Sequence, residues 1–147
     1  MGNLRPSVLD ELGLLAAVSW LTRQYQKVYS HIEVRKNIAV NEEEIPEMLK
    51  TNIFRIIQEG LNNFAKHGKG NRITLCLKKG QGSIQLKIED NGAGFDVNSC
   101  KQGMGLKNME NRVLFSRGEY SIFSQPGEGT LIQASWSIDM LNQSAGN

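Results

Sequence analysis

Two alternating segments joined by a short turn constrain the fold of this chain more than any other feature. Apolar residues occupy every second position in residues 72–79 and again in residues 83–90. The connecting residues 80–82, Gly-Gln-Gly, suit a tight turn, so the two segments are predicted to pair as a β-hairpin. Because side chains alternate across a strand, this hairpin predicts a sheet with one apolar face.

Asp90 interrupts the apolar face at the end of the second strand. It falls in phase with Ile84, Leu86 and Ile88, on the side that should look into the core. A carboxylate at such a position costs free energy unless a partner satisfies it. Residues 91–94 follow as Asn-Gly-Ala-Gly, so Asp90 could be a turn aspartate that caps a loop. Alternatively, it could recognise a ligand from the floor of a pocket.

Residues 44–66 are predicted to form a helix with two distinct faces. One arc is apolar and contains Ile53, Ile57, Leu61 and Phe64, and the other contains Asn52, Arg55, Glu59, Asn63 and Lys66. The polar arc offers a carboxylate, a carboxamide one turn later and then an ammonium group. Such a set could bind a water, a metal ion and a phosphate, although a solvated helix face could carry the same residues by chance.

The remaining segments complete an α+β pattern. We expect a two-layer α/β sandwich, with helices on one face of a mixed, mainly antiparallel sheet. The first helix is long, and the sequence slightly favours a place in an inter-chain bundle over packing on its own domain. The expected elements are a helix at 4–30, a strand at 31–40, a loop at 91–105, a helix at 105–118, and strands at 119–124 and 130–138.

Composition excludes several classes of protein. A chain of 147 residues has room for one domain, and its net charge of +2 comes from scattered cations, which argues against nucleic acid as a partner. Cys76 and Cys100 form neither a disulfide framework nor a metal-ligand spacing, and a reducing cytoplasm fits them. No apolar run approaches the ~20 residues of a spanning helix. The helix-like segment directly after Met1-Gly2 suggests a piece of a longer protein.

Gly103-Met-Gly-Leu106 places a pair of glycines at the start of a predicted helix. Glycines let backbone N–H groups approach an oxyanion, and the helix N-terminus adds its positive dipole. The pair could also be an ordinary loop that enters a helix. It is neither a Walker phosphate loop nor a Rossmann fingerprint, because the residues that define those motifs do not accompany it.

Four short motifs occur in order along the chain, and the set is far more specific than its parts. They are Glu59-x-x-x-Asn63-x-x-Lys66-His67, Asp90-Asn-Gly-Ala-Gly-Phe95, Gly103-Met-Gly-Leu106 and Gly127-Glu-Gly-Thr130. The set resembles the catalytic ATP-binding domain of sensor histidine kinases, in the superfamily of gyrase, Hsp90 and the mismatch-repair ATPases. The resemblance covers roughly residues 4–138 and implies the Bergerat-type ATP-binding fold.

The context of Met109 and Arg112 is most like the nitrate/nitrite-sensor branch of these kinases, and residues 4–14 are similar to the end of its second dimerisation helix. The chain departs from that branch at Phe64 and Gly68, where alanine is usual. We expect Phe64 to repack the core and Gly68 to end the helix early.

The resemblance implies a phosphate side and an adenine side of the site. On the phosphate side, Asn63 would coordinate Mg²⁺, Lys66 would contact phosphate, and Glu59 would polarise the attacking group or its water. Nearby, the box of Gly103, Gly105 and Leu106 would bind the nucleotide, with the two glycines donating to phosphates.

On the adenine side, Asp90 would accept a hydrogen bond from the exocyclic amine, and Thr130 would support it, for instance through a water. Gly92 and Gly94 would let the backbone pass close to the nucleotide, and residues 95–102 would form a lid. His67 at the helix end and His31 in a strand are interpreted as structural residues rather than catalysts.

The resemblance also implies a division of the chain and a set of partners. Residues 1–30 would be the remnant of a dimerisation helix, 31–138 the catalytic domain and 139–147 a tail. The parent would be a homodimer, in the cytoplasm or as the cytoplasmic part of an inner-membrane sensor. It would move the ATP γ-phosphoryl group to a histidine for relay to a response regulator.

No segment resembles the acceptor-histidine box of these kinases. This chain is therefore expected to bind ATP and Mg²⁺ without phosphorylating itself. The alternatives are an ATPase or serine kinase of the same superfamily, such as an anti-sigma factor, and a nucleotide-binding module without catalysis.

Overall fold

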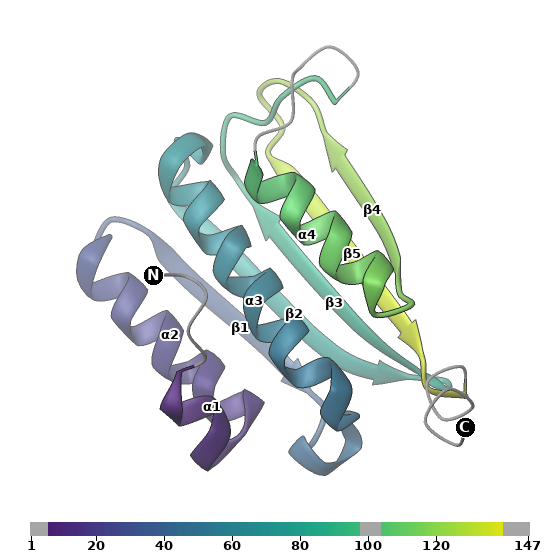
Figure 1. Ribbon diagram of the computed structural model, residues 1–147. Helices are drawn as coiled ribbons and strands as arrows, with labels where there is room; N and C mark the ends of the chain where they lie inside the picture. The colour runs from purple at the N-terminus through teal and green to yellow at the C-terminus, as the bar shows by residue number, and fades with distance from the viewer. Residues whose placement is uncertain (1–5, 98–103, 140–147) are drawn as a thin grey trace.

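The computed structural model describes residues 6–97 and 104–139, and it places the helices on one face of a single open sheet (Figure 1). The strand order is β1-β2-β3-β5-β4. Only the β1–β2 pair is parallel, and the other neighbours pair antiparallel. The strands are β1 (Glu33–Ala39), β2 (Arg72–Gly80), β3 (Ser83–Asp90), β4 (Glu119–Ser124) and β5 (Thr130–Ser137). The expected two-layer α+β architecture is confirmed.

Three helices run side by side in the helical layer, with α3 between α2 and α4 (Figure 1). None of the helices within 6–97 and 104–139 is long and apolar enough to cross a membrane. The helices are α1 (Ser7–Leu12), α2 (Leu14–Val28), α3 (Glu47–Asn63) and α4 (Met104–Phe115), with a 3₁₀ turn η1 (Glu42–Glu44) and a π-helical turn η2 (Phe64–Gly68).

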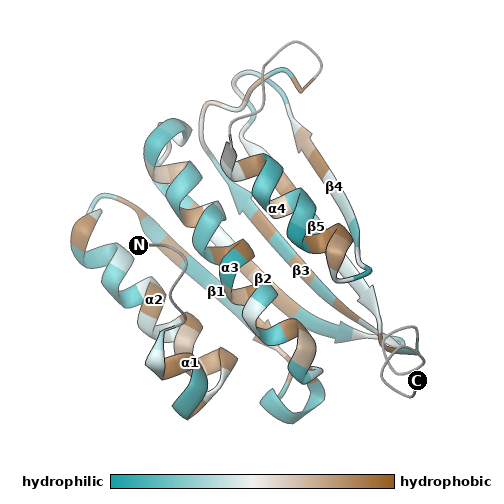
Figure 2. Ribbon diagram, viewed as in Figure 1, coloured by the Kyte–Doolittle hydropathy of each residue, from teal (hydrophilic) through white to brown (hydrophobic). Residues whose placement is uncertain are grey.

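The core lies between the sheet and the helices and follows the predicted alternation. Leu77 pairs with Leu86 across the hairpin, and both side chains are buried, as are Ile84 and Ile88. Figure 2 shows brown and teal residues alternating along β3. The apolar arc of α3 packs on this face, and the phase of Asp90 therefore directs it to the same side of the sheet.

The expectation of one continuous helix over residues 4–30 is wrong. The chain breaks at Gly13, where φ is 93° and ψ is 179°, a conformation that glycine adopts without a steric penalty. Apolar residues on both sides of the break are buried in this chain's own core, so the face that the sequence assigned to an inter-chain bundle is already occupied. These residues are Leu9, Leu14, Ala17, Val18 and Tyr25.

The helix expected at 44–66 begins and ends differently from the prediction. The acidic stretch at 42–44 forms η1 instead of the first turn of α3, with the amide of Asn41 donating to Glu44 Oε1 at 2.9 Å. At the other end, α3 gives way to η2 after Asn63, and Lys69 follows in the left-handed region with φ of 56°. Phe64 is buried, as expected, with 3% of its surface exposed.

Candidate functional site

Asp90 both caps a loop and lines a cavity, so the two interpretations of its phase are compatible. Its Oδ1 accepts a hydrogen bond from the amide of Gly92 at 2.9 Å, and its strand partner is Thr130. Burial raises the pKa of the Asp90 carboxyl above its usual range, although the backbone amides of Gly92 and Thr130 oppose that shift. A partly desolvated carboxylate of this kind is suited to recognising a hydrogen-bond donor on a ligand.

The turn between β4 and β5 lies next to Asp90. Ser124 Oγ donates to the carbonyl of Gly129 at 3.0 Å, lies 2.9 Å from Thr130 Oγ1, and accepts from the amide of Phe95 at 2.9 Å. A cavity of about 540 Å³ opens here and includes Asp90, Val97, Ser124 and Thr130 in its lining. The second and fourth motifs therefore meet at one end of the sheet.

Gly92 and Gly94 are required by the protein's own backbone. A Cβ on Gly92 would overlap the carbonyl oxygen of Gly68, to which the amide of Ala93 donates at 2.5 Å. Gly94 has φ of 65°, and a Cβ there would overlap the carbonyl oxygen of Gln125. These contacts position the loop after β3, and the expected approach of its backbone to a nucleotide stays a prediction.

The polar face of α3 meets the first turn of α4. A Cβ on Gly105 would stand 3.3 Å from Glu59 Oε2 and 3.7 Å from Asn63 Oδ1, so the backbone of Gly105 passes close to both oxygens. Glu59 and Asn63 are half-buried and Lys66 is exposed. The first and third motifs thus approach each other, and they bring a carboxylate and an amide oxygen beside the backbone of the first turn of α4.

Two predicted site residues need separate mention. Leu106 is buried with 5% of its surface exposed, so its side chain packs in the core beneath α4. Gly103 lies outside the described residues. Arg55, placed on the polar arc from the sequence, is also buried, and its Nη1 donates to Gln58 Oε1 at 2.9 Å.

A polar groove between α3 and α4 was not anticipated as a unit. It has a volume of about 440 Å³ and is lined by Glu59, Asn62, Asn108 and Asn111, among others. A signal was present in the sequence, because Asn108 and Asn111 lie three residues apart and outside the helical phase of the buried Met109. The groove gives Glu59 an approach from outside the domain.

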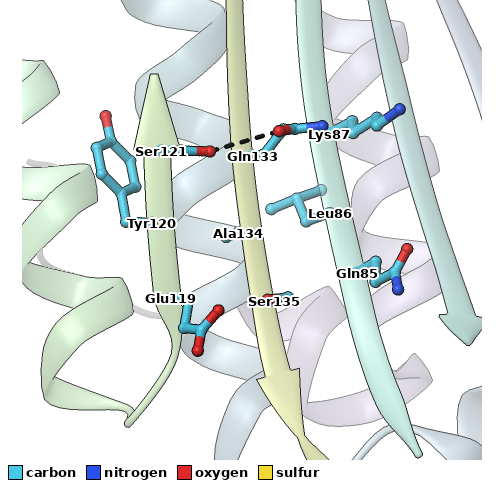
Figure 3. Close-up of a pocket in the computed structure, with 9 residues that line it drawn as sticks. All are labelled: Gln85, Leu86, Lys87, Glu119, Tyr120, Ser121, Gln133, Ala134 and Ser135. Carbon is cyan, nitrogen blue, oxygen red and sulfur yellow. Dashed lines mark hydrogen bonds between the residues drawn. The ribbon is translucent and has the colours of Figure 1, made fainter. Parts of the chain in front are cut away.

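A further hollow lies on the opposite side of the sheet, with the helices behind it (Figure 3). Its polar lining includes Lys87 and Gln133, and Ser121 Oγ donates to Gln133 Oε1 at 3.4 Å. None of the predicted site residues lines it. The predicted site residues therefore lie outside this hollow.

The chain belongs to the family of histidine kinase-, DNA gyrase B- and HSP90-like ATPases, whose pattern matches residues 48–139, more than half of its length. It is 35% identical over 126 residues to the signal transduction histidine-protein kinase/phosphatase UhpB of Salmonella typhimurium. This match covers 83% of this chain and 24% of that relative. The sensor protein VraS of Staphylococcus epidermidis is 30% identical over 146 residues, 99% of this chain and 41% of that relative. The chain thus spans less than half of the length of these relatives.

Solved structures share the fold. A histidine kinase domain from the blue-light activated kinase of Erythrobacter litoralis EL346 superposes with a TM-score of 0.71 at 15% identity, covering 89% of this chain and 65% of that one. The mycobacterial sensor histidine kinase MprB gives a TM-score of 0.61 at 19% identity, covering 82% and 91%. The family's ATP-binding domain is therefore the class to which this fold and this set of motifs belong.

Proposed function

We propose that this chain is the ATP-binding catalytic region of a two-component sensor histidine kinase. In the parent protein it would transfer the γ-phosphoryl group of ATP to a histidine outside residues 1–147, for relay to a response regulator. The observation that carries this proposal is that Glu59 and Asn63 of α3 lie close to Gly105 in the first turn of α4. Asp90 lies at the end of β3, beside its strand partner Thr130. The family and the names of the relatives support the kinase assignment.

Each end of the nucleotide has residues suited to it. Asp90 would accept a hydrogen bond from the adenine amine, with Thr130 beside it, and the Gly92–Gly94 loop would border the base. Lys66 would act as a point charge on phosphate, and the amides of Gly103 and Gly105 would donate to phosphate oxygens. Glu59 would polarise the attacking imidazole through the groove between α3 and α4.

A magnesium ion fits this set of donors. Mg²⁺ typically binds through one or two protein oxygens plus substrate phosphates and waters, rather than in a cage of protein ligands. In the part of the chain that the structure describes, no three His, Cys, Asp or Glu side chains gather to form such a cage. Asn63 Oδ1 lies beside the backbone of Gly105 and would hold the ion, which would neutralise charge on the phosphates.

The remaining parts of the assignment follow from the parent. Residues 1–30 would be the remnant of its second dimerisation helix, residues 31–138 would form the catalytic domain, and the parent would act as a homodimer with this region in the cytoplasm. An ATPase of the same family and a nucleotide-binding module without catalysis are the competing functions.

Isothermal titration with ATP, with and without Mg²⁺, tests the site. Asn63→Ala should abolish the Mg²⁺-dependent part of the affinity, whereas Asn62→Ala, its exposed neighbour, should bind like the native chain. Equal affinity with and without Mg²⁺ in the native chain would contradict the role of Asn63.

Phosphorylation assays separate the three functions. Incubation with radiolabelled ATP should leave no acid-labile phosphate on this chain alone, but should label an added acceptor-histidine domain of the parent. ATP hydrolysis without transfer would favour an ATPase, and binding without either reaction would favour the non-catalytic module.

A further inference from the structure

The break between α1 and α2 is held by a residue far away in the sequence. Glu42, in η1, accepts hydrogen bonds from the amides of Leu14 at 2.8 Å and Leu15 at 2.9 Å. These two amides belong to the first turn of α2, where helix N–H groups lack partners within the helix. Glu42 therefore acts as the N-terminal cap that no residue of the α1–α2 segment provides.

Gly13 makes this contact possible. A Cβ at this position would stand 2.7 Å from the carboxyl carbon of Glu42, closer than real Cβ contacts allow. Its φ of 93° also disfavours any other residue. The break thus depends jointly on a glycine at 13 and a carboxylate at 42.

Lys50 on α3 holds the Glu42 carboxylate in place. Its Nζ lies 2.9 Å from Glu42 Oε2 and 3.0 Å from Glu47 Oε1, and only 8% of the residue is exposed. Burial opposes ionisation of Glu42, but the amides of Leu15 and Leu14 together with Lys50 hold its pKa below the usual range. The cap is therefore charged at neutral pH.

The same two amides have a second set of possible partners. In a continuous helix they would donate to the carbonyls of Asp10 and Glu11, four residues earlier. Helical hydrogen bonds already flank the break, because the amide of Gly13 donates to Leu9 at 3.2 Å and that of Ala17 donates to Gly13 at 3.1 Å. A change of backbone angles around Gly13 would therefore convert the bent arrangement into a straight one.

We propose that residues 7–28 are a two-state hinge, which Glu42 holds bent and which becomes one continuous helix when Glu42 releases the amides of Leu14 and Leu15. Straightening swings α1 away from the domain and withdraws Leu9, now 3% exposed, from the core. The hinge sets the direction in which the chain before residue 7 leaves the domain.

Distance measurements between two spin labels test the hinge. Labels on Ser7→Cys and Gln26→Cys, with Cys76 and Cys100 replaced by serine, report the bend because Ser7 is at the end of α1 away from Gly13 and α1 packs against α2 in the bent form. A straight helix separates these positions by about 28 Å at 1.5 Å per residue. The native chain should show mainly a shorter distance, Glu42→Gln should populate the longer one, and Gly13→Ala should populate it further.

Glu43→Gln is the matched control, since Glu43 lies in the same turn but is exposed. It should keep the native distance. If Gly13→Ala fails to fold, hydrogen exchange at the amides of Leu14 and Leu15 in Glu42→Gln decides the matter. Protection retained in that variant, together with the longer distance, supports the hinge. The native distance with fast exchange at both amides means that Glu42 is only a cap and overturns the proposal.

Discussion

At the scale of single residues, Phe64 and Gly68 compete for the same space. A Cβ on Gly68 would overlap the ring of Phe64, which is buried at the start of η2. Glycine at position 68 is thus the residue that the packed ring of Phe64 allows. The sequence predicted each effect separately, but only the packing shows that they depend on one another.

Gly68→Ala should destabilise the native chain by about 1–3 kcal/mol, because an added methyl group in a packed region forces its neighbours to shift. In a Phe64→Ala background the same substitution should cost much less, since the ring is gone. Urea unfolding of both single variants and the double variant measures this coupling. Additive free energies of unfolding would show that the two positions are independent.

Asp90 illustrates a site residue whose burial costs stability. Its folded pKa is raised, chiefly by burial, so the folded chain binds a proton at this carboxyl more tightly than the unfolded chain does. The associated stability is therefore largest at acid pH and falls as the pH rises from the unfolded pKa through the folded one. Ionised Asp90 is tolerated at neutral pH at the expense of the fold.

Asp90→Asn should accordingly raise the melting temperature at pH 7, and this gain should shrink towards pH 3, where both side chains are neutral. The same change should weaken ATP binding by roughly ten- to a hundredfold, the usual worth of a hydrogen bond to a charged group. Thermal unfolding at the two pH values and calorimetry check both parts. Unchanged ATP affinity would remove Asp90 from the adenine site.

At the scale of elements, two glycines let α3 approach its neighbours, but for different reasons. A Cβ on Gly60 would stand 2.9 Å from Ile88 Cδ1, so Gly60 allows α3 to pack closely on β3. Gly105, in contrast, brings the backbone of α4 close to the polar oxygens of Glu59 and Asn63. Gly60 therefore contributes to packing of the core, whereas Gly105 lies at the candidate site.

Gly105→Ala should therefore keep or raise stability, because alanine favours helix over glycine by up to about 1 kcal/mol, while it weakens binding of Mg²⁺-ATP. Gly60→Ala should instead lower stability through its contact with Ile88. Melting temperatures and ATP titrations of the two variants provide a matched comparison. If Gly105→Ala binds Mg²⁺-ATP like the native chain, the space beside Asn63 is not part of the site.

At the scale of the whole molecule, α1 and α2 complete the core on which α3 rests. Leu14 and Ala17 are fully buried, and Val18 is 1% exposed. The boundary expected at residue 30 therefore does not separate independent packing units in this structure. A catalytic domain that starts at residue 31 would expose an apolar face of α3 and β1.

A chain shortened to residues 31–147 should lose cooperative unfolding and aggregate, because burial of each large apolar side chain contributes about 1.5–3 kcal/mol. Urea unfolding followed by circular dichroism tests this expectation against the full chain. A cooperative transition at the native urea midpoint would show that the first 30 residues are dispensable for folding.

The sequence by itself determined whatever depends on near neighbours. Alternation over residues 72–90 predicts the hairpin, the phase of Ile88 places Asp90 on the inner face, and the period of α3 separates Glu59 and Asn63 from the core. Each of these patterns is complete within a few residues, so no distant contact was needed to interpret it.

Tertiary structure alone decided the features that depend on distant partners. Glu42, which caps α2 at the break in the first helix, lies 28 residues after Leu14. The steric conflict between the Phe64 ring and a Cβ at position 68 depends on how the ring packs. The strand order, with β5 between β3 and β4, likewise reflects which edges remained available for pairing. The helical spacing of apolar residues on both sides of Gly13 favoured continuity, and the half-buried carboxylate of Glu42, which accepts two charged hydrogen bonds, outweighed it.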